Sequence, residues 1–435
     1  DFDDGESEVS AQARKIDPSR VLYYTKLPDG TYSVDGFMES EGAKGTVTIE
    51  NDSDIIYTKI SASAFEGVNL TKVILPDTIT EIGDKAFYNC SSLTSVNTPA
   101  NLKIIGKEAF SGCNHLEAFD FPKGVEVIKD KAFYNAEWAI DLPESVRKVG
   151  SKAFATNRKY RTARNLTIRG NIANLAADAF DGIIVKYLEL GKDVEDLPEY
   201  LMPGSRDQEV YSELKGVRID KENSVWSSED DVWYGAWFDK DRTALLKYPC
   251  KRSYVSKYEI PSTVTKIWPY AFQDSQIHEV VIPDSVTSVG TGAFYDCKAT
   301  SINIPDWMTS IPDYAFAADL KSVKLPESVV KIGEGAFYGG AYTSLTIPES
   351  VVEIGAKAFD GGSYTSLNIP DSVEKIGEDA FGSRRINCTI TIGSGLKDIT
   401  NLPEVQAYVV SDENPRFSSE DGVLFNKDKT ILKRY

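Results

Sequence analysis

Apolar and polar residues alternate along this chain in a pattern that returns about every 22 positions. The dipeptide Ala-Phe marks the repeat most clearly. Its phenylalanines fall in two series: Phe65, Phe87, Phe110, Phe133, Phe154 and Phe180, then Phe272, Phe294, Phe316, Phe337, Phe359 and Phe381. A near-constant period of this length predicts a solenoid of stacked coils, because leucine-rich repeats run to 20–29 residues.

The residues around the dipeptide repeat with it, as LTIPESVVEIGAKAFDGGSYTS over residues 345–366 illustrates. Leu345 and Ile347 alternate with polar neighbours, which is the period of a half-buried strand. Pro348 has no N–H to donate to a ladder, so we expect the strand to end there. Val351 and Ile354 lie three residues apart and predict a tight turn of 3₁₀ or helical type on the opposite side of the coil.

The second half of the repeat predicts the core. Phe359 should point inward and stack on Phe337 and Phe381 of the adjacent coils. Ala358 is small enough to lie against a neighbouring coil, and Gly355 suits a backbone bend. One such coil cannot bury its own apolar side, but stacked coils bury one another and form a continuous core with parallel strands.

The IPxSVxxIGxxAF runs, seen for instance in IPESVVEIGAKAF and IPDSVEKIGEDAF, resemble the BspA-like leucine-rich repeat family of bacterial surface proteins. The resemblance covers most of residues 55–435. It implies a β-rich repeat solenoid, a right-handed leucine-rich repeat superhelix of about 22-residue coils with a parallel β-sheet. It also implies a secreted or surface-attached protein with a role in adhesion, and it offers no catalytic residues to carry over.

The phenylalanine series breaks between Phe180 and Phe272, and a second period appears there. Residues 219–249 resemble residues 410–435, with Asn223 matching Asn414 at an offset of 191. Both segments read as β-hairpins with an Asx-Lys-Asp turn. We therefore predict the following parts: an acidic linker or tail (1–20), an N-terminal cap (21–54), a first module (55–249) with a hairpin at 219–249, and a second module (250–435) with a hairpin at 410–435.

Composition narrows the functions open to such a solenoid. The chain has 48 basic and 66 acidic residues, a net charge of −18, which opposes binding to nucleic acid or to an anionic membrane. No apolar run has the roughly 20 residues of a membrane-spanning helix. Only two histidines are present, and the five cysteines show no CxxC spacing. We expect no cofactor, no metal centre and no catalytic residues.

The exposed side of the strands is the first candidate binding surface. If Leu345 and its equivalents face inward, a polar row faces outward in the second module, with small hydroxyl and amide groups suited to hydrogen bonding with peptide or glycan. The candidate residues in this row are Asn303, Lys324, Thr346 and Asn368. The alternative is that they only solvate an exposed sheet.

Two acidic residues of the first module, Asp120 and Asp141, are predicted to lie about 5 Å apart in neighbouring coils. That spacing would suit a retaining glycosidase pair or a cation site. The alternative is a pair of solvated acids, because no third ligand or lid can be recognised in the sequence.

Aromatic residues outside the phenylalanine series are a further candidate. Tyr342 and Tyr364 are 22 residues apart and should stack in neighbouring coils, either as an exposed ladder for sugar or peptide or as packing at the flank. Trp233 and Trp237 lie on the first hairpin with Trp226. They are a binding hot spot if exposed and anchors if folded onto the solenoid.

Cysteines and a basic segment complete the candidates. Cys90 and Cys113 share one repeat position in adjacent coils, so a disulfide and two small buried thiols are both open. Arg158, Lys159, Arg161 and Arg164 form a basic loop that either docks an anionic partner or is only solvated.

The function predicted from the sequence is non-enzymatic binding or adhesion outside a bacterial cell, with a host or microbial protein or polysaccharide as partner. Repetition of the surface would add avidity. Two alternatives belong to other classes: a structural spacer that displays another domain, and a polysaccharide-processing enzyme that uses acids such as Asp120 and Asp141.

Overall fold

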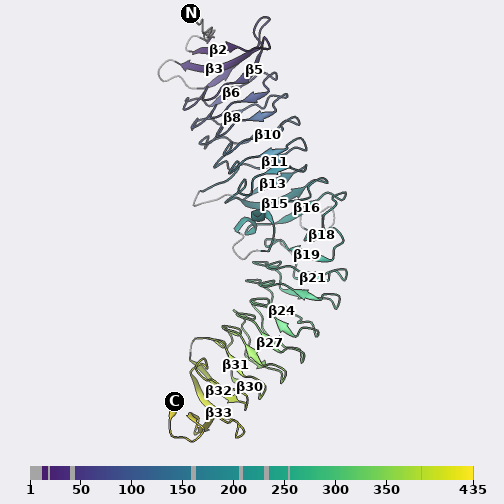
Figure 1. Cartoon of the computed structure of the whole chain (residues 1–435), viewed down its shortest axis with the longest axis vertical. Helices are drawn as coiled ribbons and strands as arrows, with labels where there is room; N and C mark the ends of the chain where they lie inside the picture. Colours follow the sequence, from purple (N-terminus) through teal and green to yellow (C-terminus); the bar gives the residue numbers. More distant parts are fainter. Residues whose placement is uncertain are drawn as a thin grey trace, which may run out of the picture. The chain divides into compact units, whose positions relative to one another are not determined.

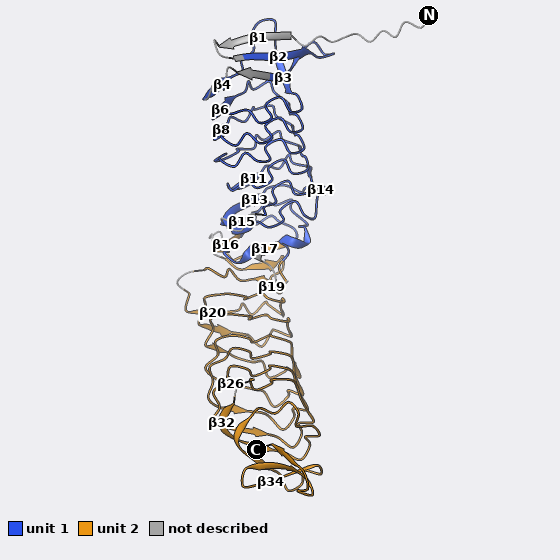
Figure 2. Cartoon of the chain, turned by 90° about the vertical axis from the view of Figure 1, so that its left-hand side faces the viewer, with its two compact units in different colours: residues 1–202, 209–213, 218–225 blue, residues 203–208, 214–217, 226–435 orange. Residues whose placement is uncertain are grey.

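The computed structural model describes residues 12–17, 20–39, 45–157, 163–204, 209–229, 235–252, 255–383 and 385–434. The chain forms two compact units (Figure 2). The first comprises residues 1–202, 209–213 and 218–225, and the second comprises residues 203–208, 214–217 and 226–435. Each unit is built from stacked coils, and the strands of successive coils lie side by side (Figure 1).

In the first unit β1, β2 and β3 pair antiparallel, and from β3 onward the coils contribute short strands that pair in parallel. The largest sheet has the order β1 (Gln12–Asp17), β2 (Arg20–Lys26), β3 (Tyr32–Glu39), β5 (Tyr57–Ile60), β7 (Glu81–Ile82), β9 (Ile104–Ile105), β10 (Val127–Ile128), β12 (Lys148–Val149), β14 (Asn174–Leu175). The other face of the coils carries β4 (Thr46–Thr48), β6 (Lys72–Ile74) and β8 (Ser95–Val96), then β11 (Ile140–Leu142), β13 (Ala163–Ile168) and β15 (Ile184–Leu190). Two 3₁₀ turns and one strand follow in the chain: η1 (Glu199–Leu201), η2 (Glu209–Tyr211) and β16 (Gly216–Ile219).

The second unit repeats this organisation. One face carries the sheets β17 (Trp226–Ser228), β18 (Trp237–Asp239), β19 (Ala244–Lys247), β21 (Lys266–Ile267), β23 (Ser288–Val289), and β25 (Ser310–Ile311), β27 (Lys331–Ile332), β29 (Glu353–Ile354), β31 (Lys375–Ile376). The other carries β20 (Lys257–Glu259), β22 (Glu279–Val281), β24 (Ser301–Ile302), then β26 (Val323–Lys324), β28 (Leu345–Thr346), and β30 (Ser366–Ile369), β32 (Ile386–Ile392), β33 (Val405–Val410). A separate sheet at its C-terminal end holds β34 (Phe417–Glu420), β35 (Val423–Asn426) and β36 (Leu432–Arg434).

The structure corrects one local prediction. The segment from Val351 to Ile354 is not a 3₁₀ or helical turn. A tight turn closes before it, where the Val351 N–H donates to the Pro348 carbonyl at 3.1 Å, and residues 353–354 then form a second short strand. In this strand Ile354 pairs in parallel with Ile332 and Ile376 of the neighbouring coils. Two β-branched residues with short spacing suit a strand edge as well as a turn, which is why the pattern misled.

The phenylalanines stack as predicted. In the first unit, rings from Phe65 to Phe180 follow one another at centroid distances of 4.9–5.5 Å with interplanar angles of 1–8°. In the second unit, rings from Phe272 to Phe381 stack at 4.8–5.9 Å. The spacing is close to the distance between hydrogen-bonded strands, so one ring per coil fills the interior without a gap. All these rings are buried.

In seven of the twelve coils a glycine stands four residues before the phenylalanine, and at Gly355 it permits close approach of two backbones. A Cβ on Gly355 would lie 2.5 Å from the Gly333 carbonyl carbon of the preceding coil, so any side chain there would force the coils apart. The left-handed backbone position comes two residues later, where Lys357 has φ of 54°. The sequence thus identifies a glycine at which a side chain would cost energy, and the structure adds that the obstacle is the backbone of the preceding coil.

The cysteines are small core residues. All five are free and buried. The Cys90 thiol donates to the Phe65 carbonyl of the preceding coil at 2.9 Å, and the Cys113 thiol donates to the Phe87 carbonyl at 3.0 Å. Burial raises the pKa of Cys90 to about 12, so the group stays protonated at neutral pH.

Candidate binding surface

The predicted outward row of the second unit is present on the strand face. Lys324 lies opposite Thr346 in the ladder between β26 and β28, and Asn368 lies opposite Thr391 between β30 and β32. Asn303 follows directly after β24, and Asn303, Lys324, Thr346 and Asn368 are all exposed. The strand alternation therefore brings these side chains to one face of the sheet. Ligand binding by them remains a prediction.

Asn303 has a structural role in addition to its exposure. Its side-chain Oδ1 accepts from the Ile282 N–H at 2.7 Å, and its Nδ2 donates to the Ile282 carbonyl at 2.8 Å. Asn97 makes the same pair of bonds to Leu75 in the first unit, at 2.6 and 2.8 Å. The amide thus extends the β-ladder to the preceding coil where the strand ends, and one Nδ2 hydrogen and one Oδ1 lone pair remain for a ligand.

A hollow of about 390 Å³ lies over this part of the strand face. Its polar lining comes from three successive coils: Asp284, Ser301, Asn303, Asp306, Ser322 and Lys324. Hydroxyl, carboxylate and ammonium groups therefore surround one concave surface, with Pro305 and Pro326 supplying rigid apolar edges. Such a surface offers hydrogen-bond donors and acceptors of several kinds to a polar ligand.

Trp307 was missed by the sequence reasoning. It follows the lining residue Asp306 directly and is 39% exposed, an unusual state for a tryptophan. In neighbouring coils its position is a serine whose hydroxyl donates to a carbonyl of the preceding coil, as Ser350 donates to Val329 at 2.7 Å. The signal that could have identified it is the loss of this serine from an otherwise regular repeat.

Tyr342 and Tyr364 are inside the protein, so they do not form an exposed ladder. Their exposed fractions are 0% and 3%, and their rings lie 6.0 Å apart at 55°. Each hydroxyl donates to the carbonyl of the phenylalanine five residues earlier, Tyr342 to Phe337 at 3.1 Å and Tyr364 to Phe359 at 2.5 Å. Burial raises the pKa of both phenols. These rings close the flank of the core.

Of the three tryptophans on the first hairpin, the structure describes two, and both are buried. Trp237 is fully buried and meets the ring of Trp226 edge-on at a centroid distance of 5.9 Å. Both therefore act as anchors of the three-stranded segment β17–β19. Trp233 lies outside the described residues, and its role as a binding residue stays a prediction.

The predicted pairing of Asp120 with Asp141 in the first unit stays a prediction. Residues 117–122 contain no strand, so the outward row is interrupted at Asp120. Asp141, on β11, is held in a two-point ion pair in which the Arg169 Nε and Nη2 each donate to a carboxylate oxygen at 2.8 Å. Its oxygens are thus already engaged by a cation. Among the described residues, no group of three or more His, Cys, Asp or Glu side chains could hold a metal ion.

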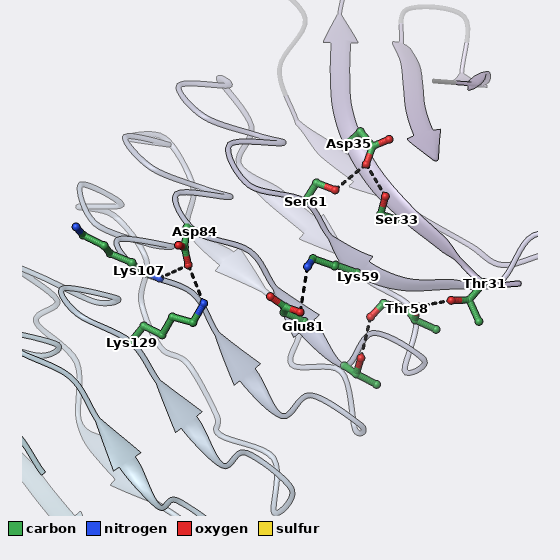
Figure 3. Close-up of polar contacts among 11 residues, drawn as sticks. Thr31, Ser33, Asp35, Thr58, Lys59, Ser61, Glu81, Asp84, Lys107 and Lys129 are labelled. Atoms are coloured by element: carbon green, nitrogen blue, oxygen red, sulfur yellow. Dashed lines mark hydrogen bonds and ion pairs between the residues drawn. The ribbon is translucent and has the colours of Figure 1, made fainter. Parts of the chain in front are cut away.

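Other polar groups of the first unit are also engaged between coils (Figure 3). Asp35 accepts hydrogen bonds from the hydroxyls of Ser33 and Ser61 at 2.5 and 2.6 Å. Asp84 accepts from the Lys107 backbone N–H of the following coil at 2.8 Å. These side chains join neighbouring coils, which gives them a structural explanation without a ligand.

The basic loop is only partly described. Arg158, Lys159 and Arg161 lie outside the described residues. Arg164 is buried, with an exposed fraction of 4%, and its guanidinium donates to the Ala136 carbonyl. Burial lowers its pKa to about 10, against the opposing effect of Glu137. Arg164 therefore contributes to the core and not to a solvated basic surface.

Comparison with known proteins places these coils in a family. The family model for a BspA type leucine rich repeat region (6 copies) matches residues 46–161, 138–206, 244–361 and 317–402. No curated protein matches the chain with significance. Where the structure describes the chain, no helix has both the length and the apolar character needed to cross a bilayer.

One of three similar solved structures has a TM-score above 0.5 and shows the same fold. A leucine-rich repeat protein from Bacteroides ovatus is 23% identical, with 89% of this chain and 98% of that chain covered and a TM-score of 0.55. A leucine rich cell surface protein from Faecalibacterium prausnitzii is 24% identical, with 93% and 97% covered and a TM-score of 0.46. A leucine-rich repeat protein from Eubacterium ventriosum is 16% identical, with 86% and 95% covered and a TM-score of 0.41.

Proposed function

The chain belongs to the BspA-type leucine-rich repeat family, and from this premise we propose that it is a non-enzymatic binding or adhesion protein that works outside the bacterial cell. Its partner in this proposal is a protein or polysaccharide of a host or of another microbe. The family consists of bacterial surface proteins, which supports an extracellular location. The net charge of −18 disfavours nucleic acid as the partner.

The observation that carries the proposal is the hollow over β24 and β26. It gathers polar side chains from three coils on one face, and Lys324 is a cation among the acids Asp284 and Asp306. Trp307 adds an exposed ring directly after the lining residue Asp306. A partner that offers hydroxyl, amide or carboxylate groups would find complementary groups here.

Asp141 favours binding over catalysis. A catalytic carboxylate in a glycosidase needs an oxygen that is free to reach the sugar. Asp141 is exposed and joined to Arg169 through both oxygens. This arrangement supports the non-enzymatic proposal over the polysaccharide-processing alternative, for which an activity screen of the Asp120→Asn variant is the direct test.

A binding screen with matched variants tests the proposal. The protein is applied to a glycan array and to a panel of extracellular-matrix proteins. Ser322→Trp fills the hollow, and Ser95→Trp makes the same change at the equivalent strand position of the first unit, where Ser95 is exposed on β8. We expect at least one ligand in the screen and a loss of its binding of about tenfold or more in Ser322→Trp only.

Two outcomes would count against the proposal. A blank screen at high micromolar concentration would favour the spacer alternative, in which the solenoid only holds another domain away from the cell. Binding that is equally weakened by Ser95→Trp and Ser322→Trp would move the site away from the hollow on the strand face.

A further inference from the structure

A second hollow lies on the flank of the second unit, at the place where the buried tyrosines end. Its volume is about 580 Å³. The lining residues that matter for its chemistry are Tyr338, Asp360, Tyr364, Phe381, Ser383 and Arg385. It shares no lining residue with the hollow on the strand face.

Two preceding coils show how this flank is normally closed. In GGAY at 339–342 and GGSY at 361–364, the tyrosine ring folds back onto the glycine two residues before it. A Cβ on Gly340 would lie 2.1 Å from the Tyr342 ring, and one on Gly362 would lie 2.3 Å from the Tyr364 ring. Each glycine therefore makes room for a phenol ring, which then fills the flank of its own coil.

The next coil lacks this ring. Residues 382–388 read GSRRINC and contain no aromatic residue. This coil is also longer by one residue: Phe359 to Phe381 is a step of 22, whereas the paired strand residues Ser366 and Thr389 are 23 apart. Ile386 stands where a third tyrosine would, 22 residues after Tyr364, and packs partly buried against the core. Because isoleucine is smaller than tyrosine and has no hydroxyl, a hollow remains beside Tyr364 and Phe381.

We propose that this hollow is a binding site for a tyrosine side chain presented by a partner polypeptide. The chain itself fills the equivalent place with a phenol ring in two coils, so the local geometry already suits such a ring. Tyr338, which is 39% exposed, adds an accessible ring to one wall, while Tyr364 and Phe381 supply the base. Aromatic pairs favour edge-to-face or offset contacts of this kind.

The rim has the polar groups that a peptide segment would need. Asp360 and Arg385 carry opposite charges, and Ser383 and Asn387 add hydroxyl and amide groups. Ser383, Arg385 and Asn387 are exposed, so they can reach the main chain or the phenol hydroxyl of a partner. A base made of aromatic rings, surrounded by a polar rim, favours a tyrosine side chain over an aliphatic one.

The experiment measures binding of N-acetyl-L-tyrosinamide to the full chain by ligand-observed NMR. We expect a dissociation constant in about the millimolar range, as is usual for a small fragment. N-acetyl-L-leucinamide should not displace it. Ser383→Trp, which fills the hollow from an exposed position, should weaken binding about tenfold or more, and Tyr338→Ala should weaken it several-fold. Ser322→Trp, in the hollow on the strand face, is the matched control and should leave binding unchanged.

Several results would overturn the proposal. They are an absence of binding at tens of millimolar, equal displacement by the leucine amide, and unchanged binding in Ser383→Trp. Free L-tyrosine serves as a second arm, because the ring could also come from the free amino acid. Tighter binding of free L-tyrosine than of the amide would contradict the polypeptide as its source. The strand-face variant Ser322→Trp reports separately on the proposed adhesion function, so failure of one proposal is distinguishable from failure of the other.

Discussion

The two three-stranded segments β17–β19 and β34–β36 begin in the same way. Asn223 and Asn414 are fully buried and precede them at equivalent positions. Asn223 donates through Nδ2 to the carbonyls of Gly191 and Val194 at 2.9 and 2.8 Å. Asn414 makes the matching bonds to Gly393 and Leu396 at 2.8 and 3.4 Å. One buried amide thus fixes the start of each segment.

The two segments differ at their third strands. Leu245 on β19 is fully buried, and it pairs in parallel with Ile267 on β21 of the following coil. The equivalent Leu432 on β36 is 57% exposed, and among the described strands β36 pairs with β35 alone.

Equivalent glutamates in the two segments also differ in their contacts with the rest of the chain. Glu229 accepts from Arg252 at 2.8 Å and from the Tyr258 hydroxyl. Its equivalent Glu420 meets Lys429 at 3.2 Å on the surface. A shared motif therefore determines its own turns and its first hydrogen bonds. The coil that packs against the motif determines how deeply the motif is buried and which charges it pairs with.

The largest expected difference in stability between the two segments is at the equivalent leucines Leu245 and Leu432. Leu245→Ala should lower the free energy of unfolding by about 2–5 kcal/mol, because it leaves a cavity in a closed core. Leu432→Ala should change it by less than about 0.5 kcal/mol, because that side chain is mostly in water. Chemical denaturation of the two variants measures both values, and equal losses would show that β36 is covered in solution.

Lys247 on β19 should make the free energy of unfolding depend on pH. Burial lowers its pKa to about 8 in the folded chain, although Cys250 and the Asp274 carboxylate oppose this shift. At this position the unfolded chain, with an ordinary lysine near 10.5, binds more protons between these values, so the contribution of Lys247 to stability should rise as pH increases from about 8 toward 10. The total effect is on the order of 3 kcal/mol. The buried thiols, whose pKa values are raised, act in the opposite direction in the same range.

Lys247→Met removes the titrating group and should abolish that rise while it stabilises the protein at pH 7. Its equivalent on β36 is Arg434, which is partly exposed. Unfolding curves at several pH values between 7 and 10 check this. A difference in unfolding free energy between Lys247→Met and the unaltered protein that stays constant from pH 7 to 10 would contradict the role of Lys247.

For the asparagine that both segments share, we expect the same loss of stability in the two segments. Asn223→Ala and Asn414→Ala each leave two carbonyls without their donor and should each cost about 2 kcal/mol. The two losses should agree to within about 0.5 kcal/mol. A clearly larger loss at one position, measured by the same denaturation, would show that the two asparagines are not equivalent.

Much of the fold could be predicted from the sequence because it depends on local, repeated choices. Phe359, Leu345 and Pro348 recur at fixed positions, and each is sufficient to place a core ring, a strand or a strand end. The second strand at Glu353–Ile354 was missed because two residues are too few to show a period. The cost of a side chain at Gly355 was predicted, but its contact with Gly333 was not, because that contact is made between coils.

The candidate surface was less predictable, for a related reason. Asn303, Lys324, Thr346 and Asn368 follow from strand alternation, so their exposure could be foreseen. Tyr342 and Tyr364 differ because a ring can turn inward or outward from the same loop, and the outcome depends on the glycine beside each one. The hollows depend on departures from the repeat: Trp307 in place of a serine at one, and a missing tyrosine with one extra residue at the other.

The fold depends on coils that stack in register around a column of rings within each unit. A double-mutant cycle tests this stacking most directly. Phe337 and Phe359 are stacked at 5.4 Å, whereas Phe337 and Phe381 lie two coils apart with Phe359 between them. Each single change to Ala should cost about 3–5 kcal/mol.

We expect a coupling free energy of about 0.5–1.5 kcal/mol between Phe337 and Phe359, measured as the departure of the double variant from the sum of the single changes. We expect additivity within about 0.5 kcal/mol for Phe337 and Phe381. Equal coupling in both pairs, or no coupling in either, would contradict the stacked column.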